Sequence, residues 1–314
     1  MHDIPNTLKQ GFDTPVLLLV FNRPDNTQKV FDELKKIQPR FLYVVADGAR
    51  AHKSDENERV EAVRQIFLTQ IDWTCELKTL FRPQNMGCRD SVSSGISWFF
   101  EQVTEGIILE DDCIPHPDFF IFCQQTLAQH RDNPKVMCIC GTQFLPKAAP
   151  AGQAYHYTHM PYTWGWATWQ RAWDLYDVNA SQISTFASNP NNPLSKNLSA
   201  FIANKILQKI DNSGKKIADT WDYQWLFTLL LHNAYSICPT RNLVQNIGFD
   251  PNASHFTYQT QYMNLPTFPL PQPFEHPAVP ARLDWAYDRQ IQELLFGKNL
   301  FERLVRYIRA KIGR

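Results

Sequence analysis

Short apolar runs alternate with amphipathic segments along the first 145 residues of the chain. The first run, residues 16–21, is apolar throughout and ends at Asn22-Arg-Pro24, which is typical of a strand buried on both faces. In residues 26–37, apolar side chains recur at helical spacing. The same alternation predicts strands at residues 41–46, 77–81, 106–109 and 136–140, and helices at residues 56–68, 90–103 and 117–130.

Strands that alternate with helices predict an α/β fold with a doubly wound, mostly parallel sheet flanked by helices. Ligands of such sheets bind beyond the carboxyl ends of the strands. The polar residues expected at that edge are Asn22, Arg23, Asp47, Asn85, Arg89, Glu110, Asp111 and Asp112. The topology therefore predicts that these side chains converge on one binding site.

The pattern changes after about residue 146. An aromatic stretch at residues 162–169 precedes polar sequence rich in Asn, Pro and Ser. The later segments predict helices at residues 194–211 and 219–233, a strand at residues 242–248, and a C-terminal helical extension from about residue 283. A proline-rich segment at residues 266–280 resembles an extended linker.

Composition narrows the class of protein. The 314 residues are 44% hydrophobic and 20% charged, which is ordinary for a globular chain. Lys+Arg and Asp+Glu both number 31, so no net field attracts nucleic acid and we expect no such partner. Seven cysteines without paired spacing predict buried, reduced thiols and a cytoplasmic protein. No signal-peptide pattern or apolar run of roughly 20 residues is visible, so we expect a soluble or peripheral protein.

The acidic triplet Glu110-Asp111-Asp112 directly follows an apolar strand. Three adjacent carboxylates are costly to place together unless a cation meets them, and hard divalent cations prefer oxygen ligands. A cation there would offset the charge that develops on a leaving diphosphate. The alternative is a solvated turn, but the apolar strand before the triplet and the Pro-His-Pro-Asp-Phe-Phe sequence after it favour the cation site.

Residues 107–120, Ile-Ile-Leu-Glu-Asp-Asp-Cys-Ile-Pro-His-Pro-Asp-Phe-Phe, resemble the GT-A fold glycosyltransferases related to N-acetylglucosaminyltransferase I. Over about residues 14–256 the chain is more similar still to bacterial family-two-like glycosyltransferases, some of which carry the label "hemolytic protein". Their Trp-Gly-Trp-Ala-Thr-Trp signature stands at residues 164–169. The resemblance implies a GT-A fold, a nucleotide-sugar donor such as a UDP-sugar, and Mn²⁺ or Mg²⁺ as the cofactor.

The resemblance also implies roles for single residues. Asp112 would bind the metal, whereas Glu110 and Asp111 would contact the donor sugar or ribose. Asp47 would meet the uracil or ribose, and the nucleotide pocket would be lined by Phe21, Asn22 and Arg23. In the alternative interpretation, Asp47 and Asn22 only form or cap turns.

The segment at residues 82–89 resembles the Asn-x-Gly element of the same family, with Asn85 at the donor site. Gly87 permits a positive φ. Arg89, near the start of a helix, would face phosphate or the acidic triplet. A purely structural role for Arg89 is the alternative.

Two further donor contacts and one metal contact are implied. Trp164 would stack on the sugar or acceptor, and Gly165 would let the backbone approach the donor. A packed aromatic cluster explains Trp166 and Trp169 at least as well. His255 would support the metal and diphosphate from a loop that orders when donor binds, although a lone His is more often structural.

Transfer with inversion needs a base that accepts the proton of the acceptor hydroxyl. The candidate segment, residues 219–225, begins an amphipathic helix and reads Asp-Thr-Trp-Asp-Tyr-Gln-Trp, where the related enzymes have Trp-Asp-Asp-Trp. Because Tyr223 replaces the second Asp, we assign the base to Asp222, with Asp219 in reserve. Alternatively, both are acids that the dipole favours at a helix N-terminus.

The last 17 residues, 298–314, are basic, and most of their apolar side chains fall in one arc of a helical wheel. This pattern predicts a helix on an anionic membrane, at the inner face of the cytoplasmic membrane and close to a lipid-linked acceptor. A helix docked on the domain is the alternative.

The predicted activity is transfer of a sugar from a nucleoside diphosphate to a hydroxyl of a glycan or lipid. The resemblance suggests synthesis of bacterial lipopolysaccharide, lipooligosaccharide or capsule. We expect a donor-binding half at residues 1–145, an acceptor-binding half of the same domain at residues 146–265, and a linker with the basic helix at residues 266–314. The sequence carries no signal for an oligomeric state.

Three alternatives remain open. A sugar-nucleotide pyrophosphorylase would share the fold and metal, but it needs a glycine-rich first loop that Phe21-Asn-Arg-Pro-Asp25 lacks. A non-enzymatic, hemolysin-like membrane protein has the terminal basic helix as its support. A binding domain without activity would explain the missing second Asp of the base motif.

Overall fold

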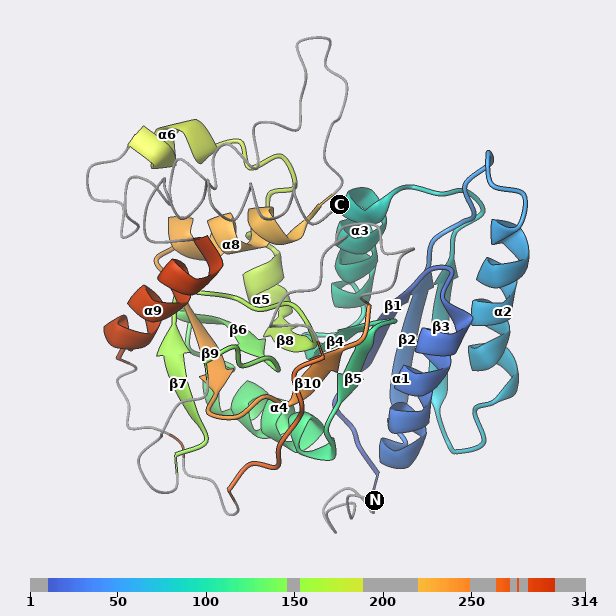
Figure 1. The fold of residues 1–314 in the computed structure, drawn as a ribbon, viewed down its shortest axis with the longest axis horizontal. Helices are drawn as coiled ribbons and strands as arrows, with labels where there is room; N and C mark the ends of the chain where they lie inside the picture. Colours follow the sequence, from blue (N-terminus) through green and yellow to red (C-terminus); the bar gives the residue numbers. More distant parts are fainter. Residues whose placement is uncertain are drawn as a thin grey trace, which may run out of the picture.

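A computed structural model describes residues 11–145, 153–188, 220–248, 264–271, 276 and 282–296. Its first half contains four parallel strands joined by helices. In order across the sheet, the strands are β3 (Glu76–Phe81), β2 (Phe41–Ala46), β1 (Val16–Val20) and β4 (Glu105–Glu110). The connecting helices are α1 (Pro24–Ile37), α2 (Glu56–Thr69) and α3 (Cys88–Phe100). Figure 1 shows α1 and α2 beside these strands.

The same sheet continues into the second half of the chain. Beyond β4 its order is β8 (Trp166–Trp169), β6 (Val136–Cys140), β9 (Tyr235–Pro239) and β7 (Tyr155–Thr158). Strand β8 is antiparallel to both of its neighbours, β7 is antiparallel to β9, and the remaining strands are parallel. A separate two-stranded sheet pairs β5 (Cys113–Pro115) with β10 (Val244–Asn246).

The other described helices are α4 (Pro117–His130), α5 (Gln170–Trp173), α6 (Ile183–Ser188), α8 (Asp222–Leu231) and α9 (Trp285–Phe296). Of these, α4 packs on the same face of the main sheet as α1, and the rest pack on the opposite face. Within the part of the chain that the structure describes, none of the helices combines the length and the apolar character that a membrane crossing requires.

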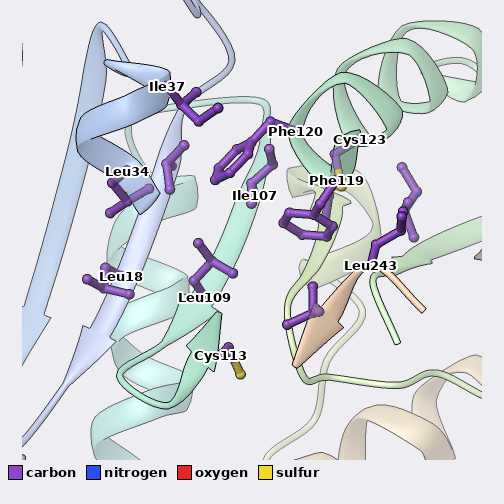
Figure 2. Close-up of a cluster of buried hydrophobic side chains, with 14 of the residues drawn as sticks. Leu18, Leu34, Ile37, Ile107, Leu109, Cys113, Phe119, Phe120, Cys123 and Leu243 are labelled. Carbon is purple, nitrogen blue, oxygen red and sulfur yellow. The ribbon is translucent and has the colours of Figure 1, made fainter. Parts of the chain in front are cut away.

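Alternate residues of each central strand contribute to two different cores. In β4, Ile107 and Leu109 pack with α1 and α4, as Figure 2 shows, whereas Ile108 packs with α3, α5 and α8 on the opposite face. Side chains alternate across a strand, so a strand covered on both faces must be apolar at every position. This is why β1, β2 and β4 are recognisable as unbroken apolar runs.

The predicted α/β architecture with a doubly wound, mostly parallel sheet is confirmed. The prediction was incomplete for the second half, because strands β7, β8 and β9 were not expected as strands. Strand β8 lies within the aromatic stretch, and all of its side chains are buried, so it lacks the period of two that marks a half-buried strand. The predicted helices at residues 194–211 and 298–314 lie outside the described residues.

All seven cysteines are free in the structure, whereas the sequence predicted that all of them would also be buried. Five are buried, whereas Cys75 and Cys88 are partly exposed.

Candidate functional site

The acidic triplet stands where β4 ends. Glu110 is the last residue of the strand and pairs in register with Leu19 of β1, so the turn after it lies beside the turn after β1. Glu110 and Asp112 are partly buried, and Asp111 is buried. The structure therefore brings the predicted triplet together with the first loop, as the strand order demands.

Arg23 lies against this triplet. Its Nη1 donates to Asp112 Oδ2 at 2.8 Å and lies 3.4 Å from Asp111 Oδ1. The backbone N–H of Phe21 donates to Asp111 Oδ2 at 3.2 Å. The loop after β1 thus supplies a guanidinium and an amide to the acids after β4.

Strand β10 holds the other side of Asp112. Asn246 Nδ2 donates to Asp112 Oδ1 at 3.3 Å, and the Ile247 N–H donates to the Asp112 carbonyl at 2.8 Å. A Cβ at Gly248 would lie 2.0 Å from Asp112 Oδ2, so the backbone there has to be glycine for the carboxylate to fit. Asn246 and Gly248 were missed by sequence reasoning, since nothing local links residues 246–248 to the triplet.

Negative charge exceeds positive charge in this cluster. Burial raises the pKa of Glu110 well above its ordinary value, and Asp112, Asp111 and Asp222 raise it further, while Arg23 lowers it. Asp222 therefore lies close enough to act on Glu110, although it belongs to a distant part of the sequence. The site is electrostatically suited to accept a further cation.

Asp222 is the first residue of α8 and is exposed. Its neighbour Tyr223 has its pKa raised to about 12 by burial and by the Asp222 charge, so this phenol stays protonated near neutral pH. Of these two residues, Asp222 is the one that can accept a proton. The reserve base Asp219 and the predicted metal ligand His255 lie outside the described residues.

Asp47 and Asn85 tie the loops after β2 and β3 together. Asp47 Oδ1 accepts from the N–H groups of Gly48 and Met86 at 2.9 and 3.0 Å, and Asn85 Nδ2 donates to Asp47 Oδ2 at 3.0 Å. Burial raises the pKa of Asp47, although the backbone N–H groups of Met86 and Gly48 oppose the shift. The alternative of a turn-forming role for Asp47 is therefore realised, and contact of Asp47 or Asn85 with a donor stays a prediction.

Asn22 reaches a buried acid that the sequence did not reveal. Asn22 Nδ2 donates to Glu56 Oε1 at 2.8 Å, and Glu56 also accepts from the backbone and the guanidinium of Arg50. Burial alone would raise the pKa of Glu56, but the Arg50 hydrogen bonds lower it to about 2. The Arg50 guanidinium lies 5.4 Å from the centre of the Phe21 ring. The predicted nucleotide-pocket residues Phe21 and Asn22 are thus fixed by Glu56 and Arg50.

Gly87 and Arg89 begin α3. Gly87 has a φ of 78°, as its predicted positive φ required. Arg89 Nε donates to Asp90 Oδ1 at 2.8 Å. Arg89 also lies near Tyr176: burial and Asp222 raise the pKa of that phenol, and Arg89 opposes them. Arg89 and Asp222 therefore both lie near Tyr176.

The aromatic stretch divides into buried and partly exposed residues. Trp166 and Trp169 are buried, and Trp166 stacks on Trp221 at a ring distance of 5.7 Å, so the packed-cluster interpretation is correct for both. Trp164 is partly exposed and contacts Phe144 edge-on at 5.2 Å. A stacking role for Trp164 remains a prediction.

Packing explains Gly165. Its φ is +66°, and a Cβ there would lie 2.7 Å from Val244 Cγ2. Its carbonyl accepts from the Gly141 N–H at 2.7 Å. These contacts give a structural reason for the glycine, and its approach to a donor stays a prediction.

The residues present fit a divalent cation that takes only part of its coordination from the protein. Asp112 offers hard carboxylate oxygens in a surplus of negative charge. In the described ranges, no three His, Cys, Asp or Glu side chains converge closely enough to hold a metal by themselves. A cation at Asp112 would therefore complete its coordination with phosphate oxygens and water, as Mg²⁺ usually does.

Comparison with known proteins gives weak likenesses. No family model and no curated protein matches the chain. Mouse xyloside xylosyltransferase 1 is 10% identical, with a TM-score of 0.33 over 71% of this chain and 83% of that one. A cytidylyltransferase from Leptospira borgpetersenii is 9% identical, with a TM-score of 0.32 over 67% and 82%. Mannose-1-phosphate geranyltransferase from Thermus thermophilus is 10% identical, with a TM-score of 0.33 over 72% and 73%. Likenesses this low carry no argument about the chemistry of this chain.

Proposed function

We propose that the protein is a metal-dependent glycosyltransferase that moves a sugar from a nucleoside diphosphate, such as UDP, to a hydroxyl. The observation that carries this proposal is the surplus of carboxylates at the carboxyl edge of the sheet. Glu110, Asp111 and Asp112 gather there, with Asp222 close enough to raise the pKa of Glu110. An edge of this kind is where α/β sheets bind their ligands.

The donor would lie across the loops that follow β1, β2 and β4. Asp112 would hold Mn²⁺ or Mg²⁺, and the bound ion would neutralise charge on the leaving diphosphate. Phe21 and Asn22, held in place by Arg50 and Glu56, would border the nucleoside. The resemblance to GT-A enzymes supports the same arrangement, with Asp47 near the base or ribose.

The acceptor would approach from the side of α8. Its hydroxyl oxygen attacks the anomeric carbon, the bond from that carbon to the diphosphate oxygen breaks, and Asp222 takes the hydroxyl proton. The exposure of Asp222 supports this role, because a base must be reachable by an incoming acceptor. Attack from the face opposite the diphosphate inverts the anomeric configuration.

The acceptor class follows from the sequence resemblance alone. We propose a glycan or lipid-linked acceptor of a bacterial surface polysaccharide or lipooligosaccharide. The basic segment at residues 298–314 would hold the enzyme on the inner face of the cytoplasmic membrane, where such an acceptor is confined.

A panel of nucleotide sugars tests the proposal. Thermal unfolding is measured with each nucleotide sugar, with and without Mn²⁺. We expect at least one to raise the melting temperature in Mn²⁺ and to release a nucleoside diphosphate when an acceptor is added. Release of pyrophosphate from a sugar phosphate and a nucleoside triphosphate would instead support the pyrophosphorylase. Failure of every nucleotide and nucleotide sugar to stabilise the protein would contradict a nucleotide-dependent function.

A further inference from the structure

We propose that Arg23 is a built-in counter-cation of the acidic triplet, which a divalent metal must displace from Asp112. Metal binding is therefore weak until a nucleoside diphosphate binds and forms an ion pair with the Arg23 guanidinium. This inference rests on the proposed function, because it concerns the same site. It adds a positioning residue and an order to the binding of the two ligands.

The position of Arg23 is set by the backbone. It is the N-cap residue of α1, directly before Pro24, and its carbonyl accepts from the N–H and the hydroxyl of Thr27 at 2.9 and 2.8 Å. Proline at the first helical position fixes the start of the helix. The Arg23 side chain is therefore delivered to the acids from a rigid element.

The ion pairs are partly shielded from water. Exposure is 23% for the Arg23 side chain, 10% for that of Asp111 and 15% for that of Asp112. Charge-assisted hydrogen bonds are stronger in such surroundings than at an open surface.

A metal and Arg23 compete for the same oxygen. Nη1 of Arg23 lies 2.8 Å from Asp112 Oδ2, while Asn246 donates to Oδ1. The Gly248 backbone lies so close to Oδ2 that the carboxylate has little room to turn. A divalent ion on this carboxylate would stand next to a guanidinium, and two cations sharing one carboxylate repel each other. Metal binding thus requires the ion pair between Arg23 and Asp112 to break.

The displaced guanidinium needs a new anion. A diphosphate held beside Asp112 supplies one, because guanidinium and phosphate form strong charge-assisted hydrogen bonds. Metal and nucleoside diphosphate should therefore strengthen each other's binding, and the coupling between them should depend on Arg23.

Calorimetric titration of Mn²⁺ without nucleotide, and of UDP at saturating Mn²⁺, tests this exchange. We expect Arg23→Gln to bind Mn²⁺ alone roughly tenfold more tightly than wild type, since no cation has to be displaced. The same variant should bind UDP about tenfold more weakly at saturating Mn²⁺. Arg23→Lys keeps the positive charge, so its Mn²⁺ affinity should stay near that of wild type. Arg131→Gln, which removes a guanidinium from Glu105 at the other end of β4, is the matched control and should change neither affinity.

Opposite signs for the two ligands are the signature that a merely structural role would not produce. Equal or weaker Mn²⁺ binding by Arg23→Gln, in a protein whose UDP binding still needs Mn²⁺, would overturn the inference and leave the proposed function intact. Absence of Mn²⁺ and UDP binding in wild type and variants alike would remove the proposed function together with the inference. If Arg23→Gln does not fold, Arg23→Met takes its place with the same expected signs.

Discussion

The two ends of strand β4 carry acids in opposite electrostatic situations. At its start, Glu105 meets the Arg131 guanidinium in two hydrogen bonds of 2.7 and 2.8 Å. At its end, Asp111 and Asp112 both form ion pairs with the Arg23 guanidinium, at 3.4 and 2.8 Å, and Glu110 precedes them in the chain. Both ends belong to one six-residue strand, so the difference arises from what surrounds each end.

The comparison separates a structural acid from the acids that we propose to bind the metal and donor. An exposed, two-point pair such as Glu105–Arg131 is balanced and contributes little to stability. Three acids beside one guanidinium are unbalanced: burial raises the pKa of Glu110, and the neighbouring carboxylates raise it further. Unbalanced charge is tolerated where a ligand completes the site.

The largest effect of a substitution is expected at the carboxyl end of β4, where the acids outnumber their cation. Asp112→Asn should abolish metal-dependent nucleotide binding and lower turnover by about a thousandfold or more, because the amide no longer offers a charged ligand to the cation. Nucleotide affinity with and without Mn²⁺, together with sugar transfer, measures the change. Glu105→Gln, at the start of β4, is the matched control and should retain both activities. Equal donor binding by wild type and Asp112→Asn would contradict the comparison.

Asp222→Asn should separate binding from transfer. We expect turnover to fall by about a hundredfold or more, since an amide cannot accept the acceptor proton, while Mn²⁺-dependent donor binding stays within about twofold. Steady-state transfer and nucleotide titration give the two values. Unchanged turnover would take the base away from Asp222 and direct attention to Asp219.

Glu56→Gln tests the ion pair with Arg50 that fixes the predicted nucleotide-pocket residues. Loss of the buried charge leaves the partly exposed Arg50 guanidinium without its carboxylate, and we expect the free energy of unfolding to fall by about 3 kcal/mol at pH 7. Urea unfolding of both proteins measures this. A difference below about 0.5 kcal/mol would show that the pair is no stronger than the one at Glu105.

The pH dependence of that difference follows from the pKa of Glu56. Its folded value, about 2, lies below the ordinary value of about 4.3. The stabilisation is therefore complete above about pH 4.3 and is lost as pH falls toward about 2. Unfolding curves at pH 7, 4 and 3 should show wild type approaching Glu56→Gln, and a constant difference would contradict the assignment.

The smallest effect is expected at the balanced end. Arg131→Gln removes a surface pair whose guanidinium is 57% exposed, so unfolding should change by less than about 1 kcal/mol. Thermal unfolding in low and high salt measures this. A change as large as that of Glu56→Gln would mean that the start of β4 is not the balanced end that its geometry indicates.

Burial determined which strands could be recognised from the sequence. Strands β1, β2 and β4 are covered on both faces, so their apolar runs identified them directly. Strand β8 is also fully buried but carries Trp at both ends, so its sequence is typical of a packed aromatic cluster and does not mark it as a strand. Strand β9 has no comparable local signal, because its place beside β6 comes from a pairing with a segment about a hundred residues earlier.

The candidate site divides in the same way. The acids after β4 and the polar residues after β1 could be placed from strand order alone. The buried Glu56 could not, because an acid in the first turn of a helix is ordinarily a solvent-exposed dipole partner. Asn246 and Gly248 could not either, since β10 reaches Asp112 by pairing with β5 outside the main sheet.

The sequence by itself determined the α/β layering, the edge where ligands would bind and the presence of an acidic triplet there, because burial and strand ends leave local patterns. The tertiary structure decided which cation meets those acids. Arg23 and Asp112 are 89 residues apart, and their 2.8 Å contact exists because β1 and β4 are neighbours in the sheet. Charge compensation acts through space between chain segments, so no local pattern of residues encodes it.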